Sequence, residues 1–154
     1  MRRTSICGAL ESLLIDKIAL NCHGVIIIKS LISSGCEVLV DSKINKLFNN
    51  KLKLAKEIDW KTEYLVLIIS MKIVSDVKEA IDHINHYGSH HSDCIITSSE
   101  ANANLFMNNV DSATVFWNVS TRFSDGDEFG FGAEIGISTD KLHARGPMAL
   151  RELT

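Results

Sequence analysis

A nearly continuous apolar segment, residues 64–74, constrains the fold of this chain more than any other feature. Strands buried on both faces of a parallel sheet have this uninterrupted apolar pattern, whereas half-buried strands alternate apolar and polar residues. Asp76 follows as an N-cap, and apolar residues then recur at helical spacing until Gly88, which we expect to end the helix. The segment therefore predicts a buried strand followed by a helix.

Shorter segments continue this alternation in both directions. We expect strands at residues 11–14, 37–40, 94–97 and 113–119, a short helix at 43–48, a basic loop at 49–56 and a helix capped by Ser98 or Ser99. Residues 18–33 have the length of a helix, but Gly24 and the β-branched run 25–28 give them poor helix propensity. Together these elements predict an α/β fold with a mostly parallel sheet flanked by helices. Because no repeat or proline-rich linker divides the chain, we expect one domain over 1–154.

Composition excludes several classes of protein. The chain has 154 residues, of which 45% are hydrophobic and 23% charged, enough for one core and too apolar for intrinsic disorder. Its net charge is -3 and it has no run of Lys and Arg, so no nucleic acid is expected as a partner. No apolar run approaches the roughly 20 residues that cross a bilayer, so no membrane is expected either. Four cysteines without a CxxC pair indicate reduced thiols and a cytoplasmic location.

The last third of the chain is rich in glycine and charge. Gly126, Gly130, Gly132 and Gly136 have neither the spacing of a dinucleotide-binding fingerprint nor that of a P-loop. We therefore expect a loop rather than a regular core element at residues 123–146. Because α/β proteins place their chemistry in loops that follow sheet strands, residues 120–147 form a candidate active-site or interface region.

Histidines and cysteines provide the candidate reactive side chains. His83, His86, His90 and His91 cluster around the end of the expected helix, but no cysteine or carboxylate stands at ligand spacing, so a solvated helix face is favoured and no metal site is predicted. Cys36 and Cys94 begin or lie within expected buried strands, and Cys22 lies in the apolar segment. Cys7 is the best candidate for an exposed, reactive thiol.

Four blocks of sequence resemble one enzyme family. The longest is the gapless run 118–148, NVSTRFSDGDEFGFGAEIGISTDKLHARGPM. The second block is the segment 62–74, which begins with TEYL and ends with KIV. The third is EAIDHINHYGSHHSD at 79–93, and the fourth is RTSICGALE at 3–11. These blocks resemble gamma-glutamyl phosphate reductase (glutamate-5-semialdehyde dehydrogenase), a member of the aldehyde dehydrogenase superfamily. The resemblance covers nearly all of this chain but only the C-terminal, catalytic-domain part of the family.

The resemblance implies roles for individual residues. Cys7 matches the family's catalytic cysteine, with Thr4 in place of a proline and Gly8 in place of an asparagine. Glu63 matches the glutamate that contacts the nicotinamide ribose. Asn118, Arg122, His143 and Arg145, together with Lys141, are candidates for the substrate pocket, and the cations among them are either ligands of phosphate or carboxylate or solvated loop residues.

Departures from the family pattern also have consequences. Asp127 replaces a glycine, which costs on the order of 1 kcal/mol if that position has a positive φ angle. Trp117 and Val119, on either side of Asn118, replace smaller residues and would crowd a substrate pocket.

The family reaction is the NADPH-dependent reduction of L-glutamyl 5-phosphate to glutamate-5-semialdehyde in proline biosynthesis. By resemblance, the dinucleotide-binding domain lies outside this chain, so we expect the isolated chain to be impaired or inactive. A complementing dinucleotide-binding chain or a homo-oligomer would then be its partner. The mean hydropathy of +0.10 is high for a small domain and agrees with an uncovered partner surface. The alternative is a non-enzymatic remnant or an oligomer-interaction module.

Overall fold

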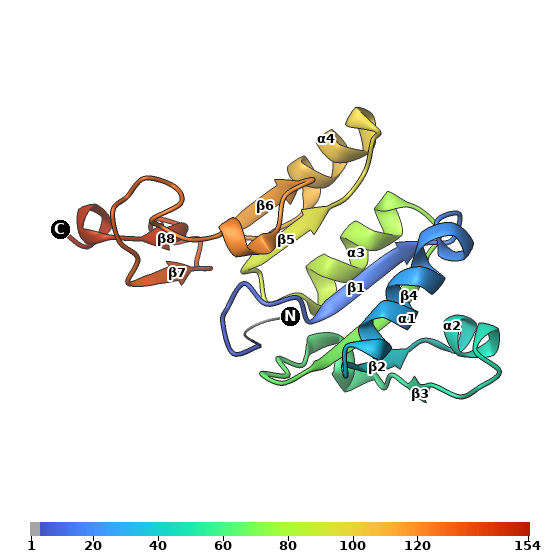
Figure 1. Ribbon diagram of the computed structural model, residues 1–154. Coiled ribbons are helices and arrows are strands. Elements are labelled where there is room, and N and C mark those ends of the chain that lie inside the picture. Colours follow the sequence, from blue (N-terminus) through green and yellow to red (C-terminus); the bar gives the residue numbers. More distant parts are fainter. Residues whose placement is uncertain (1–3) are drawn as a thin grey trace. The chain divides into compact units, whose positions relative to one another are not determined.

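The structure, a computed structural model, describes residues 4–154. Residues 1–3, including Arg3 of the cysteine block, lie outside the described residues. The chain forms two compact units, the first ending at Ala80 and the second comprising Ile81–Thr154 (Figure 1). Helix α3 (Val77–Tyr87) begins in the first unit and ends in the second.

The first unit is built on a four-stranded sheet in the order β1-β4-β2-β3. Its strands are β1 (Ser12–Asp16), β2 (Glu37–Val40), β3 (Lys53–Leu54) and β4 (Ile68–Val74), and every pairing is parallel. The π-helical turn η1 (Leu20–Gly24) and helix α1 (Val25–Ser33) join β1 to β2, helix α2 (Ser42–Leu47) joins β2 to β3, and the 3-10 turn η2 (Glu57–Lys61) precedes β4. The α/β class with a parallel sheet is confirmed.

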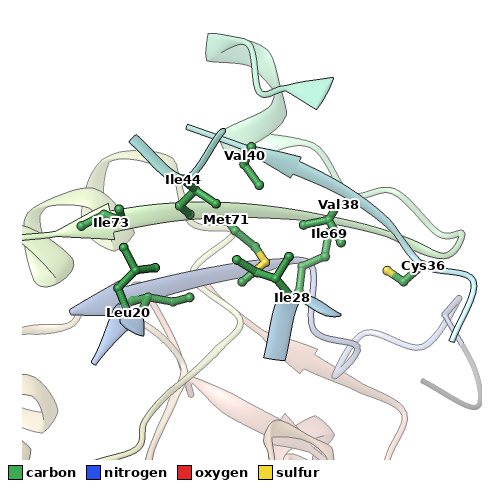
Figure 2. Close-up of a cluster of buried hydrophobic side chains, with 10 residues drawn as sticks. Leu20, Ile28, Cys36, Val38, Val40, Ile44, Ile69, Met71 and Ile73 are labelled. Atoms are coloured by element: carbon green, nitrogen blue, oxygen red, sulfur yellow. The ribbon is translucent and has the colours of Figure 1, made fainter. Parts of the chain in front are cut away.

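One apolar cluster holds this unit together (Figure 2). Ile28 of α1 and Ile44 of α2 are fully buried with Val40, Ile69 and Met71 of the central strands. Packing explains why residues 20–33 are helical although their propensity is poor, because burial of an isoleucine side chain is worth about 1.5–3 kcal/mol. That gain exceeds the propensity deficit of a few β-branched residues.

The apolar run at 64–74 is a strand only in its second part. β4 begins at Ile68, and from Ile69 on its residues are mostly buried, whereas Leu65, Val66 and Leu67 are exposed. Leu65 has a φ angle of 57°, which places its backbone in the left-handed region. For a bulky residue the left-handed backbone conformation costs about 1–2 kcal/mol, so this conformation of Leu65 lowers the stability of the fold.

The second unit contains two small sheets. β5 (Ser92–Ile95) and β6 (Thr114–Trp117) pair in parallel and are connected by α4 (Glu100–Asn109), which Ser99 caps by accepting a hydrogen bond from the Asn102 N–H. β7 (Gly136–Ser138) and β8 (Gly146–Met148) pair antiparallel. The 3-10 turns η3 (Thr121–Phe123) and η4 (Leu150–Leu153) complete the unit. The glycine-rich stretch thus contains regular structure, contrary to expectation, because residues on both sides of its loop form a ladder.

Gly88 ends α3 by allowing a close approach rather than a left-handed turn. Its N–H donates to the Ile84 carbonyl at 2.7 Å, and a Cβ at this position would lie 2.6 Å from the same oxygen. Only glycine fits this contact without displacing the backbone. Across residues 4–154, no helix has the length and apolar character needed to cross a membrane.

Asp41 provides a test of this fold. Its carboxylate accepts hydrogen bonds from the Ile44 N–H of α2 at 2.8 Å and from the Ile73 N–H of β4 at 2.9 Å. We predict that Asp41→Ala lowers the free energy of unfolding of the first unit by about 2 kcal/mol, because it removes a helix cap and leaves a buried N–H without an acceptor. Urea unfolding monitored by Trp60 fluorescence in a Trp117→Phe background measures this change.

Asp82→Ala serves as the matched control for Asp41→Ala. Asp82 is exposed on α3, and the change there is expected to stay within about 0.5 kcal/mol. Equal unfolding curves for the Asp41 and Asp82 variants would contradict the role given to Asp41.

Candidate functional site

Cys7 lies on an exposed turn directly before β1. The Ala9 N–H donates to the Ile6 carbonyl at 2.9 Å, so Cys7 and Gly8 occupy the two central positions of a β-turn. We call residues 5–10 the cysteine loop. Its thiol is accessible to solvent, as a nucleophile must be.

The cysteine loop and the Glu63 segment lie at the same edge of the first unit's sheet. β1 and β4 are parallel with Ser12 opposite Ser70, so the residues preceding both strands meet at the amino edge. The Thr4 hydroxyl donates to the Leu65 carbonyl at 3.0 Å, and the Ser70 N–H donates to the Glu11 carbonyl at 3.0 Å. The structure therefore places the segments of Cys7 and Glu63 at the same edge of the sheet.

The carboxylate of Glu11 feels the charge of Glu63 near this edge. Burial raises the pKa of Glu11, the negative charge of Glu63 raises it further, and the Tyr64 backbone N–H acts in the opposite direction. Glu63 itself is exposed. Burial together with the charge of Asp59 raises the pKa of Tyr64 to about 12, and its hydroxyl donates to the Asp59 carbonyl at 3.1 Å. Tyr64 therefore stays neutral and serves as an anchor for the segment that carries Glu63.

The other three cysteines differ in exposure. Cys36 is buried, as expected for a strand neighbour, and burial raises its pKa. Cys94 is half-buried in β5 and its pKa is also raised by burial. Cys22 is exposed, contrary to what an apolar helix suggests, because η1 turns it away from the core. Exposure therefore does not by itself distinguish Cys7 from Cys22.

In the second unit, Asn118 closes the end of the β5–β6 sheet. Its φ angle is 56°, and its side-chain amide accepts from the Thr97 N–H and donates to the Thr97 carbonyl, both at 2.9 Å. The Trp117 indole donates to the same carbonyl at 2.9 Å. The Asn118 side chain thus extends the ladder beyond β6, and its contact with a substrate stays a prediction.

A chain of hydroxyl groups positions the turn that carries Arg122. Ser124 is buried, and its hydroxyl is 2.9 Å from that of Thr114, which is 2.7 Å from that of Ser92. The Ser120 hydroxyl caps η3 by accepting from the Arg122 N–H. Arg122 and His143 are both exposed, and within residues 4–154 neither side chain forms a hydrogen bond or an ion pair.

Arg145 and Lys141 are already engaged with an acidic partner. Lys141 Nζ is 2.5 Å from one carboxylate oxygen of Asp111, and Arg145 Nη1 is 2.8 Å from the other. Arg145 Nη2 also donates to the Asp111 carbonyl at 3.2 Å. Hydrogen bonds from Lys141 and Arg145 lower the pKa of Asp111 to about 2. This ion-pair cluster fastens the segment before β8 to the turn between α4 and β6.

Further contacts make Asp111 a junction within the second unit. The backbone N–H of Asp111 donates to the Asn85 amide oxygen at 2.8 Å, and a His90 ring nitrogen lies 2.5 Å from the Asp111 carbonyl oxygen. Since a carbonyl only accepts, that His90 nitrogen carries a proton. Sequence reasoning missed Asp111, because its partners lie far away along the chain and no local pattern marks it.

Of the two helix histidines, His86 is exposed, in agreement with the expected solvated face, whereas His83 is not. His83 is buried and its ring lies 4.6 Å from that of Tyr87. In the described part of the chain, no three His, Cys, Asp or Glu side chains are arranged to hold a metal ion.

The strain expected at Asp127 does not arise. Asp127 has no positive φ angle, whereas Gly130 and Gly132 have φ angles of 79° and 78°. The close approach lies instead at Gly126, where a Cβ would be 2.6 Å from the Ala133 carbonyl oxygen. The glycine-rich segment therefore has glycine at the positions with a positive φ angle, 130 and 132, and at the close backbone contact, 126.

Comparisons with known proteins agree on one enzyme. No family model matches the chain. Gamma-glutamyl phosphate reductase of Clostridium beijerinckii is 53% identical over 152 residues, 99% of this chain and 36% of the relative, and that of Rhodopseudomonas palustris is 49% identical over 100% and 36%. The chain thus spans about 36% of the length of these curated relatives.

Solved structures give the same result. The crystal structure of gamma-glutamyl phosphate reductase from Thermotoga maritima matches with a TM-score of 0.94 and 45% identity over 99% of this chain and 36% of that one. A propionaldehyde dehydrogenase from Clostridium phytofermentans matches with a TM-score of 0.61 and 11% identity over 94% of this chain and 41% of that one, which indicates a shared fold alone.

The Asp111 cluster predicts a specific dependence on acid. Because the pKa of Asp111 falls from 3.8 to about 2 on folding, its stabilising contribution is complete above about pH 4 and is lost as the pH falls toward 2. We expect Asp111→Asn to remove that loss, so that the difference in thermal midpoint between wild type and variant shrinks from pH 6 to pH 2.5. A difference that stays constant over this range would contradict the ion-pair account.

Proposed function

Because this chain is homologous along its whole length to gamma-glutamyl phosphate reductases, we propose that it carries the thiol chemistry of that enzyme, with Cys7 as the nucleophile. The observation that supports this most is the exposed Cys7 turn, anchored at the same sheet edge as the Glu63 segment. A nucleophile on a turn at the edge of a rigid sheet is accessible yet held in place.

The proposed reaction begins at the sulfur. The Cys7 thiolate attacks the acyl carbon of L-glutamyl 5-phosphate, the carbon–oxygen bond to phosphate breaks, and inorganic phosphate leaves with the electron pair. A thioester on Cys7 results, which is electrophilic enough to accept hydride. Addition of hydride and cleavage of the carbon–sulfur bond then release glutamate-5-semialdehyde and regenerate the thiolate. No water is needed in either step.

The second unit offers basic side chains for an anionic substrate. The side chains of Arg122 and His143 are exposed and form no hydrogen bond or ion pair within residues 4–154, so they are available to bind a phosphate or a carboxylate. Arg145 and Lys141 already share the carboxylate of Asp111, so an anion would have to compete with it. Among the predicted pocket residues we therefore favour Arg122 and His143 over Arg145 as anion ligands.

The cofactor of the proposed reaction is NADPH, which supplies the hydride when bound. Glu63 fits a ribose contact, because an exposed carboxylate accepts hydrogen bonds and ribose hydroxyls donate them. The position of Glu63 beside the cysteine loop supports this assignment. We place the protein in the cytoplasm, where its thiols stay reduced.

The thiol step can be tested without the cofactor. On incubation with acetyl phosphate, we expect Cys7 to become acylated and phosphate to be released. Peptide mapping by mass spectrometry identifies which cysteine carries the acyl group. Cys22, which is also exposed, provides the internal reference. Cys7 should react at least about tenfold faster than Cys22, the ratio that about 1.4 kcal/mol of transition-state stabilisation gives.

Two variants make this measurement specific. Cys7→Ser should lose the fast acylation and Cys22→Ser should keep it. Equal acylation rates at Cys7 and Cys22 would overturn the proposed role of Cys7.

An oligomer-interaction role is a second candidate, supported by exposed apolar side chains on and beside α1. Ile18 is 81% exposed and Ile26 is 66% exposed, and Ile32 is exposed as well. Each such side chain would contribute roughly 1.5–3 kcal/mol if a homo-oligomer or a complementing dinucleotide-binding chain covered it. This role is compatible with the proposed chemistry.

Sedimentation tests the second candidate directly. We expect analytical ultracentrifugation of the isolated chain at micromolar concentration to show self-association, and Ile26→Lys to weaken it by placing a charge in the contact. A folded chain that remains strictly monomeric at all concentrations would count against a homo-oligomer.

A further inference from the structure

The residues that flank the cysteine loop, Thr4 and Glu11, are hydrogen-bonded to the chain at residues 65–70, which comprise the segment before β4 and the first three residues of that strand. At the rear end of the loop, the Glu11 carbonyl accepts from the Ser70 N–H at 3.0 Å and from the Ser70 hydroxyl at 3.3 Å. At its front end, the Thr4 hydroxyl donates to the Leu65 carbonyl at 3.0 Å. Since the Ile6–Ala9 turn lies between these two anchors, the position of Cys7 depends on both.

The two anchors differ in origin. The rear anchor belongs to the β1–β4 pairing, because Ser70 is opposite Ser12 in the ladder. The front anchor is a single side-chain hydrogen bond outside any ladder, and its acceptor precedes Ile68, the first residue of β4. Leu65 is exposed and has a left-handed backbone, so no regular element holds its carbonyl in place.

We infer that Thr4 is a positioning residue: its hydrogen bond to Leu65 closes the cysteine loop onto the Glu63 segment and so holds the Cys7 thiol beside that segment. This inference rests on the proposed function for its meaning, because positioning matters only if Cys7 and Glu63 act in one reaction. Reactions between held groups are sensitive to misplacement of about 1 Å, so the loss of one hydrogen bond at a loop end is consequential.

Substitution of the hydroxyl tests the anchor. Thr4→Val keeps the shape of the side chain and removes the donor, whereas Thr4→Ser keeps the donor. Hydrogen exchange by mass spectrometry should show amides of residues 5–10 and of residues 63–67 exchanging about fivefold faster in Thr4→Val, the factor expected for a hydrogen bond worth about 1 kcal/mol. Thr4→Ser should restore both segments to wild-type rates.

Thr154→Val is the matched control, because the Thr154 hydroxyl also donates to a backbone carbonyl, that of Leu150, in the other unit. It should leave both segments unchanged. Unchanged exchange in Thr4→Val, or equal exchange in Thr4→Val and Thr4→Ser, would overturn the inference.

A second readout separates this inference from the proposed function. In the acetyl phosphate assay, Thr4→Val should narrow the rate advantage of Cys7 over Cys22, and Thr4→Ser should retain it. If the wild-type protein shows no Cys7 advantage although the exchange results hold, the chemistry fails and the loop anchor stands. If the advantage is present but Thr4→Val does not change it, the positioning role is wrong and the chemistry stands.

Discussion

The parallel pairing of β1 with β4 is the constraint on which the rest of the first unit depends. It matches Ser12 with Ser70 and Asp16 with Val74, so the two strands run side by side along the whole of β1. Their side chains supply much of the apolar cluster shown in Figure 2. The loops that precede the strands, with Cys7 in one and Glu63 in the other, are thereby brought to one edge.

Charge is distributed unevenly among the predicted site residues. In the second unit, the carboxylate of Asp111 pairs with both Lys141 and Arg145, whereas Arg122 and His143 are exposed to solvent. The ion pairs at Asp111 fasten the loop between β7 and β8 to the turn that precedes β6. Exposed pairs of this kind contribute modestly to stability, so their main effect is on loop geometry. The basic residues of the block 118–148 therefore form two groups. Lys141 and Arg145 have a structural role, whereas Arg122 and His143 are available to bind an anion.

The sequence predicted the α/β class well because its strongest signals are local. Residues 37–40 form β2 as expected, since a short apolar run ends at the helix-capping Asp41. Local pattern failed where tertiary structure decides. Leu65–Leu67 are apolar yet exposed, and the helix at 25–33 forms because Ile28 packs into the core.

For the candidate site, position along the chain and family resemblance both favoured Cys7, whereas Glu63 was proposed from the resemblance alone. Asp111 and the Thr4–Leu65 bond were missed, because such contacts join residues far apart in the chain. Thr4 was visible only as a departure from the family pattern, and Asp111 had no signal beyond its charge.

The most direct measurement of the central claim is a proximity test between Cys7 and position 63. In a background with Cys22, Cys36 and Cys94 replaced, Glu63→Cys should be bridged to Cys7 by a short bis-maleimide within one molecule. Lys17→Cys, at the carboxyl end of β1 and hence at the opposite edge of the sheet, should not be bridged. Efficient cross-linking at 63 and none at 17 is the predicted result; equal cross-linking, or none at 63, would contradict a shared edge for Cys7 and Glu63.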